Sequence, residues 1–130
     1  MSVFKNVSEI EEAETLLAAY AYGQRAFSGL CLNQADLQES NLKGADLSYA
    51  ELNEANLSQA NLRGADLSYA SLSGADLSGA NLRGSMLIGT DLRQATLTDA
   101  DFHGADYDPA ETHFPDGFDP VIAEMKSDRA

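Results

Sequence analysis

The chain has 130 residues, with 21 Asp and Glu against 8 Lys and Arg, and its formal net charge of −13 disfavours general nucleic-acid binding, which needs the opposite sign. No apolar run is long enough to span a bilayer, and the N-terminal stretch MSVFKNVSEIEEAE lacks the basic and apolar regions of a signal peptide. Cys31 is the single cysteine and cannot form an internal disulfide, which predicts a reducing, cytoplasmic location.

The first predicted element is a helix from about Glu9 to Tyr22, within an N-terminal segment of residues 1–24. Ser8 and Glu11 have the spacing of a capping box, and Gly23 follows as a stop. The residues expected on one face of this helix are Ile10, Ala13, Leu17, Tyr20 and Ala21. We expect this face to cover the open end of the repeat that follows, and docking of a partner on the helix is the alternative.

Residues 25–110 carry a leucine or a close substitute every five residues, from Phe27 to Tyr107. On an α-helix, five steps would turn each leucine roughly 140° from the last, so no buried stripe would form. On a straight strand, an odd spacing sends every second leucine to the opposite face. All the leucines can be buried together only if the chain bends once per repeat in the same direction. The spacing therefore predicts a coil with its leucines pointing to the axis.

A second period of 20 residues sets the number of sides. The segment NLKGADLSYAELNEANLSQA (41–60) matches NLRGADLSYASLSGADLSGA (61–80) at 14 of 20 positions, whereas a shift of five residues matches only 9. Four pentapeptides therefore make one coil, and neighbouring coils should pair as parallel strands about 4.8 Å apart. Because parallel crossovers are right-handed, the predicted fold class is an all-β solenoid, a right-handed quadrilateral parallel β-helix of about four coils.

The pentapeptides ADLQE, ADLSY, ANLSQ, ANLRG and ADLSG closely resemble the A-[DN]-L-x-x pattern of the pentapeptide-repeat protein family. The resemblance extends over about two-thirds of the chain, which is too long a run for chance. It implies a right-handed quadrilateral β-helix, the Rfr fold, in which the central leucine and the preceding small residue face inward. The spacing argument leads to the same fold independently.

The C-terminal segment, 111–130, leaves the repeat and is expected to cap the stack. Phe114 and Phe118 are expected to lie over the last coil, and a short amphipathic turn follows from Val121 to Met125. The residues expected to interrupt strand pairing are Pro109, Pro115 and Pro120.

The stretch YDPAETHFPDGFDP is similar to a tail of the form YDxxTxFPxGFDP, common after pentapeptide repeats in cyanobacterial proteins. The match departs from that form because Ala110 and Glu111 precede Thr112. The resemblance implies a small, single-β-helix protein of cyanobacterial type, and it implies no activity.

Residues 20 positions apart stack into columns on the outside of the coil. One column, the basic ridge, consists of Lys43, Arg63, Arg83 and His103. The column beside it consists of Asn41, Asn61, Asn81 and Asp101, which we expect to hydrogen-bond along the axis. The simplest interpretation of the ridge is a solvated surface, with basic and acidic columns on adjacent faces relieving each other's repulsion.

The next face carries Tyr49 stacked above Tyr69, with Met86 and Ile88 at outward positions. Aromatic and arginine side chains are enriched in interface hot spots, so the alternative to a solvated surface is that this face and the ridge dock a partner. The candidate partner-binding residues are Lys43, Arg63, Arg83, Tyr49, Tyr69 and Ile88.

No catalytic, cofactor-binding or metal-binding pattern is visible, so we predict that the chain is not an enzyme and needs no cofactor. His103 and His113 stand ten residues apart without a cluster of ligands at zinc spacing. Cys31 has no catalytic signature around it, and no glycine-rich phosphate loop opens a helix.

Three hypotheses for function stay open. The first is a rigid scaffold that docks an unknown protein, as a monomer or weak dimer with no membrane contact. The second is a mimic of DNA that inhibits or protects DNA gyrase, an idea that the resemblance suggests and the basic ridge disfavours. The third, a regulatory role in cyanobacterial differentiation or stress, rests on the family resemblance alone.

Overall fold

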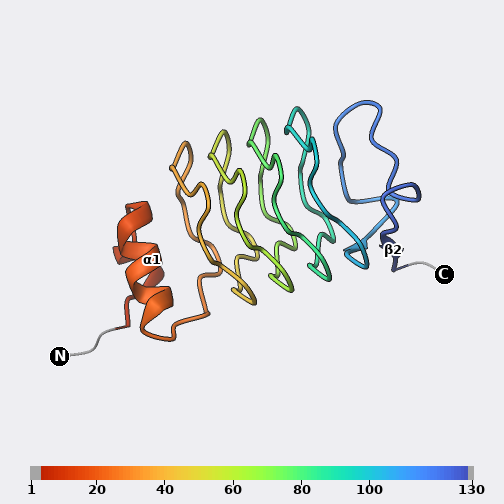
Figure 1. The fold of residues 1–130 in the computed structure, drawn as a ribbon. Helices are drawn as coiled ribbons and strands as arrows, with labels where there is room; N and C mark the ends of the chain where they lie inside the picture. Colours follow the sequence, from red (N-terminus) through yellow and green to blue (C-terminus); the bar gives the residue numbers. More distant parts are fainter. Residues whose placement is uncertain (1–3, 129–130) are drawn as a thin grey trace.

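The structure is a computed structural model that describes residues 4–128. Its regular elements are η1 (Val7–Glu9), α1 (Ala13–Ala21), β1 (Asp106–Tyr107) and β2 (Lys126–Ser127). Between α1 and β1 the chain winds into stacked coils, shown in Figure 1, which are joined by parallel bridges between residues 20 apart. The predicted right-handed, four-sided β-helix is confirmed, with a helix capping one end and a short segment the other.

Coils are numbered from the first bridged residue, Ala26, so that coil 1 spans residues 26–45. The coils that follow span 46–65, 66–85, 86–105 and 106–125. Coils 1 to 4 each have four sides of five residues, and the first side of coils 2, 3 and 4 begins at Asp46, Asp66 and Met86.

Each side is only one bridge long because the chain turns immediately after each leucine. The Leu47 N–H donates to the carbonyl of Asp66 in the next coil at 2.8 Å, and the Ala50 N–H closes the corner on the Leu47 carbonyl at 3.1 Å. The residue two places after each leucine has a positive φ, for example 70° at Gly44 and 61° at Tyr49. We call this place the corner position. Half of the corner positions between 29 and 104 hold glycine, the residue that adopts this conformation without steric cost.

The interior is filled by the leucines and by the small residues that precede them. Leu67, in the middle of the stack, and Ala65 are both completely buried, with 0% exposure. Where the small residue carries a hydroxyl, the hydroxyl is hydrogen-bonded to a backbone carbonyl. Ser85 donates to the carbonyl three residues before it at 2.7 Å, and Thr90 donates to the Leu67 carbonyl of the previous coil at 2.8 Å. Each of these buried hydroxyls therefore has a hydrogen-bond partner that offsets the cost of removing it from water.

The N-terminal helix is shorter than predicted. The single turn η1 comes first, Ile10 and Glu12 are extended, and α1 begins only at Ala13, so the expected capping box of Ser8 and Glu11 is wrong. The break places Ile10 in the core, where only 3% of it is exposed. Burial of this side chain outweighs the local preference for a longer helix. The expected stop is confirmed, because Gly23 follows α1 with a φ of 104°.

The face that α1 turns to coil 1 also differs from the prediction. Leu16 and Ala19 are buried, Leu17 is only partly buried, and Ala21 is exposed. Apolar residues lie on most sides of this short helix, so the sequence periodicity does not predict which side is buried. The contact of α1 with coil 1 determines the buried side. The Tyr20 hydroxyl donates to the carbonyl of Lys43 at 2.6 Å, which attaches the helix to the end of coil 1.

Coil 5 continues the stack beyond the pentapeptide pattern. Asp91 is bridged to His113, which is 22 residues away instead of 20, so the corner after Tyr107 holds two additional residues. Thr112 takes the inward small position, where its hydroxyl donates to the Leu87 carbonyl at 2.7 Å and accepts from the Asp108 N–H at 2.9 Å.

The end of coil 5 closes on β1. β2 pairs with β1 in parallel, with Lys126 opposite Asp106, so the 20-residue period returns. As expected, aromatic rings cover this end: Phe118 packs edge-on against Phe102 with centroids 5.3 Å apart, and it stacks on Phe114 at 4.8 Å. The turn between them and β2 exposes Val121 and Ile122, which are 73% and 81% accessible.

Candidate functional site

The exposed aromatic side chains of the coils gather in one column. Tyr49 and Tyr69 hold equivalent corner positions in coils 2 and 3, and their rings stack with centroids 5.3 Å apart and planes 15° apart. The rings remain 62% and 46% exposed. The stacking expected from their spacing is therefore present. We call Tyr49, Tyr69, Met86 and Ile88 the tyrosine face.

The coil 4 end of the tyrosine face is held by a glycine and a glutamate. A Cβ placed on Gly89 would clash with the ring of Tyr69, so the ring lies directly over this glycine. The Tyr69 hydroxyl donates to the Glu111 carboxylate at 3.0 Å. Met86 is 39% exposed, whereas Ile88 is half-buried. The face is therefore a preformed surface, aromatic in coils 2 and 3 and aliphatic in coil 4.

Glu111 raises the pKa of Tyr69, first through the hydrogen bond that it accepts and then through its charge. Because the pKa of the folded state lies above that of the unfolded chain, this bond stabilises the fold fully below the ordinary tyrosine pKa. The stabilisation is lost as pH rises through the raised pKa. At neutral pH the link between coil 3 and coil 5 is therefore intact.

A glycine-to-alanine pair tests the contact between Tyr69 and Gly89. Gly89 and Gly84 have φ values of 70° and 64°, so alanine should cost about 1 kcal/mol at either position from backbone conformation alone. Only at Gly89 does the new Cβ meet the tyrosine ring, since nothing lies within 4 Å at Gly84. We expect Gly89→Ala to lower the free energy of unfolding by about 1 kcal/mol more than Gly84→Ala.

The displaced ring should also leave Glu111, so the pKa of Tyr69 should fall toward its ordinary value in Gly89→Ala and not in Gly84→Ala. Urea unfolding and an NMR titration of the tyrosine rings measure the two effects. Equal destabilisation by both variants, with an unchanged titration of Tyr69, would show that the ring does not depend on Gly89.

The basic ridge is partly neutralised within its own face. Arg83 Nη1 lies 3.1 Å from Asp101 Oδ2 in the next coil, and His103 Nδ1 lies 2.6 Å from a carboxylate oxygen of Glu124. Lys43 and Arg63 are exposed and form no ion pair within residues 4–128. The observed pairing runs along the stack within one face, not between adjacent faces as expected, because the next coil brings a carboxylate within reach.

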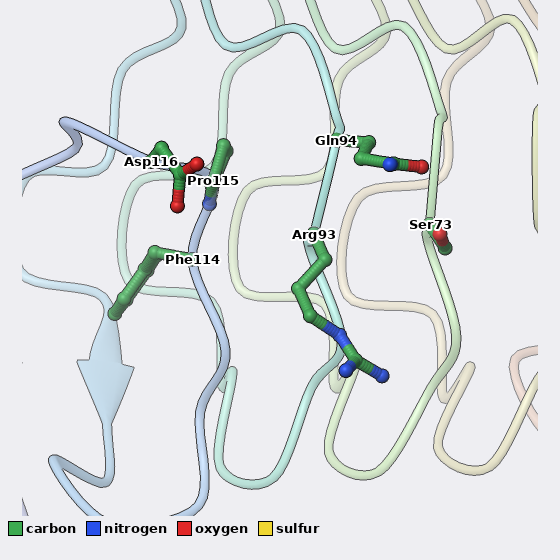
Figure 2. Close-up of a pocket in the computed structure, with 6 residues that line it drawn as sticks. All are labelled: Ser73, Arg93, Gln94, Phe114, Pro115 and Asp116. Carbon is green, nitrogen blue, oxygen red and sulfur yellow. The ribbon is translucent and has the colours of Figure 1, made fainter.

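A shallow hollow on the second side of the coil, next to the tyrosine face, was not anticipated from the sequence. It measures about 500 Å³ and, as Figure 2 shows, is lined by Ser73, Arg93, Gln94, Phe114, Pro115 and Asp116. Arg93 is held by Asp91 through Nε at 2.9 Å and Nη2 at 2.8 Å, and this bond lowers the pKa of the Asp91 carboxyl. The cation that lines the hollow is therefore already paired with a carboxylate. No local pattern in the sequence indicates this hollow, since the two additional residues of coil 5 bring Phe114 to it.

Residues 4–128 present aromatic, apolar and charged surfaces that a partner could contact. Within residues 4–128, no group of three or more His, Cys, Asp and Glu side chains is placed to hold a metal ion. Cys31 is a free thiol on the surface. No helix in the described part of the chain has the length and apolarity needed to cross a bilayer. The arrangement can stack aromatic rings, bury apolar side chains and pair charges with a partner.

The pattern of the repeat matches a known family model. The model for pentapeptide repeats matches residues 26–59, 40–79 and 75–106, with 8 copies. The chain belongs to the pentapeptide-repeat family. No curated protein sequence matches it.

Three solved structures of pentapeptide-repeat or related proteins show how far the likeness extends. The chain is 48% identical to alr5209, a pentapeptide repeat protein from Nostoc Pcc 7120, over 91% of this chain and 97% of that one, with a TM-score of 0.89. It is 32% identical to HetL from Nostoc sp. Strain PCC 7120, a protein involved in heterocyst differentiation regulation, over 80% and 56% of the chains, with a TM-score of 0.40. It is 17% identical to QnrB1, a plasmid-mediated fluoroquinolone resistance protein, over 80% and 79%, with a TM-score of 0.38.

In this pentapeptide-repeat chain an Asp or Asn that stands directly before a central leucine closes its own corner. Asp66 Oδ1 accepts the N–H of Ser68 at 2.9 Å, and Asn61 Oδ1 accepts the N–H of Arg63 at 3.1 Å. The prediction that this asparagine column hydrogen-bonds along the axis is wrong, because the side-chain oxygen satisfies a turn N–H two residues later. The same arrangement, chiefly the hydroxyl two residues on, lowers the pKa of Asp76. Asp and Asn thus close the corner in the same way, and Asp adds a negative charge.

Proposed function

We propose that the chain is a rigid, non-enzymatic docking scaffold whose protein partner binds the tyrosine face. The observation that carries the proposal is the stack of Tyr49 on Tyr69, two large rings left exposed in a repeat that directs its leucines inward. Association that covers these rings would remove apolar surface from water, and aromatic side chains commonly dominate interface energetics.

The rigidity of the coil supports this proposal. The Tyr69 N–H donates to the carbonyl of Ile88 at 2.8 Å, and the Tyr49 N–H donates to the carbonyl of Ser68 at 2.9 Å, so both corners are held by backbone bonds to the next coil. A preformed surface loses little conformational entropy on binding. The basic ridge occupies the preceding corner of the coil, and we propose that Lys43 and Arg63 contact a separate, acidic part of the same partner.

We further propose that the protein works in the cytoplasm as a monomer or weak dimer. The unpaired, exposed thiol of Cys31 supports a reducing compartment. The net charge of −13 opposes close self-association.

Affinity capture with a matched pair of variants tests the docking proposal. Met86→Ser removes the apolar side chain without adding a charge, and serine already precedes a central leucine at Ser71, so the variant should preserve the fold while making the tyrosine face less apolar. Thr96→Ser places the same side chain at the same place in the repeat, but two sides further round coil 4. We expect capture of a protein that binds the wild type and Thr96→Ser to be strongly reduced with Met86→Ser. Capture that is identical for both variants would contradict the proposal.

A further inference from the structure

The tyrosine column places bulky side chains where glycine would be accommodated better. The φ values of Tyr49 and Tyr69 are 61° and 60°. The same column holds Gly29 in coil 1 and Gly89 in coil 4, so the corner itself does not require a side chain. A residue with a Cβ costs about 1 kcal/mol or more in this left-handed region. The fold therefore gains no backbone stability from the two tyrosines, and the surface that they form needs another explanation.

Only one ring of the stack has an open face. The Tyr69 ring lies between Tyr49 and Gly89, so both of its faces are covered. Tyr49 uses one face for Tyr69, and its other face is turned toward the coil 1 end of the column. There, a Cβ built on Gly29 would meet nothing within 4 Å. The outer face of Tyr49 is therefore accessible, in agreement with the 62% exposure of this residue.

Carboxylates flank this column on both sides. Asp46 and Asp66 precede the two tyrosines on the first side of the coil, Glu51 begins the second side, and Glu111 lies in the extended corner of coil 5. No ion pair within residues 4–128 involves any of these four carboxylates. The π-face of a tyrosine is itself negative, so the ring and the carboxylates attract the same kind of ligand.

We propose that the tyrosine face recognises a cationic segment of a partner protein, rich in Arg or Lys. One cationic head lies over the open face of Tyr49, and neighbouring basic side chains pair with Asp46 and Asp66. The chain already contains this geometry at its N-terminal end, where the guanidinium carbon of Arg25 lies 3.7 Å from the ring centre of Tyr20. The same carboxylates would repel an acidic segment. The inference rests on the proposed docking function and specifies the chemistry of the partner.

A labelled peptide of alternating arginine and serine, measured by fluorescence anisotropy at physiological ionic strength, is the direct probe. Its counterpart carries citrulline, which has nearly the shape of arginine and no charge. Tyr49→Gly removes the ring and suits the local φ, so the variant should fold at least as well as the wild type. Tyr49→Phe keeps the aromatic face. Asp66→Asn and Asp36→Asn each remove one charge and keep the oxygen that closes the corner, but Asp36 lies on the third side of coil 1.

We expect Tyr49→Gly to weaken binding of the arginine peptide by about 3- to 30-fold, which is the range for a cation over an aromatic ring. Tyr49→Phe should retain most of the affinity, and Asp66→Asn should weaken binding roughly threefold more than Asp36→Asn. The citrulline peptide should not bind measurably. Unchanged binding by Tyr49→Gly, or equal losses in the two asparagine variants, would show diffuse attraction to an acidic chain and overturn the proposal.

The capture experiment separates this inference from the docking function. A captured partner that needs Met86 and Tyr49 but contacts the face through an uncharged or acidic segment would contradict the cationic ligand and leave the docking function standing. If the wild type captures no protein whose binding depends on Met86, the docking function itself is contradicted, whether or not the arginine peptide binds.

Discussion

Leu67→Asp is expected to abolish cooperative folding of the coil. Leu67 is completely buried in coil 3, midway along the stack. A carboxylate there has no partner, and burying it would cost several kcal/mol even if it became protonated, against a total stability of about 5–15 kcal/mol for an ordinary domain. Because each coil is supported mainly by its neighbours, the loss should extend to coils 2 and 4. Thermal unfolding followed by far-UV circular dichroism should show no native-like transition.

The adjacent substitution Ser68→Asp is the matched control. Ser68 lies one residue further on, points outward and is half-buried. We expect its effect to stay within about 0.5–1 kcal/mol, as for most surface substitutions. If Leu67→Asp kept the melting temperature of the wild type, the inward orientation of the leucines would be incorrect.

Leu16→Ala is expected to weaken the N-terminal cap strongly. Leu16 is completely buried between α1 and coil 1. Truncation removes its apolar contacts and leaves a cavity, which typically costs about 2–5 kcal/mol. The same change at Leu17, which is only partly buried, should cost less than about half as much. Both variants gain the same small helix propensity, so their difference reports burial alone.

Urea unfolding, followed by circular dichroism and by the NMR signals of Tyr20 on the same helix, measures this pair. The tyrosine signals show whether the cap detaches before the coils unfold. A larger loss in Leu17→Ala than in Leu16→Ala would restore the helix face predicted from the sequence and contradict the packing in the structure.

The repeat region shows how much of the architecture a spacing can predict. Leucines five residues apart exclude a straight helix or strand, and the 20-residue period sets four sides, as the bridge between Asp46 and Asp66 confirms. The stack of Tyr49 on Tyr69 follows from the same period. Its open outer face does not follow, because it depends on the space above Gly29.

The ends of the chain and the polar contacts were harder to predict. Leu16 and Leu17 are identical side chains one step apart on a mostly apolar helix, and only coil 1 distinguishes them. The Asn61 side chain can donate and accept hydrogen bonds in several directions. In the structure its oxygen accepts the turn N–H of Arg63 rather than a donor along the axis. The pairing of Arg83 with Asp101 required knowledge of which carboxylate stands nearest in the next coil.

The sequence by itself determined the coil, its four sides, its inward leucines and the columns on its surface. These properties follow from periodicity, because a regular spacing along a covalent chain can bury its apolar residues in only one way. The tertiary structure alone decided the register of α1, the additional residues in the corner after Tyr107, the hollow beside Arg93 and the open ring of Tyr49. These features depend on side chains from different coils competing for the same space and the same hydrogen bonds, and that competition is settled only when the coils are stacked.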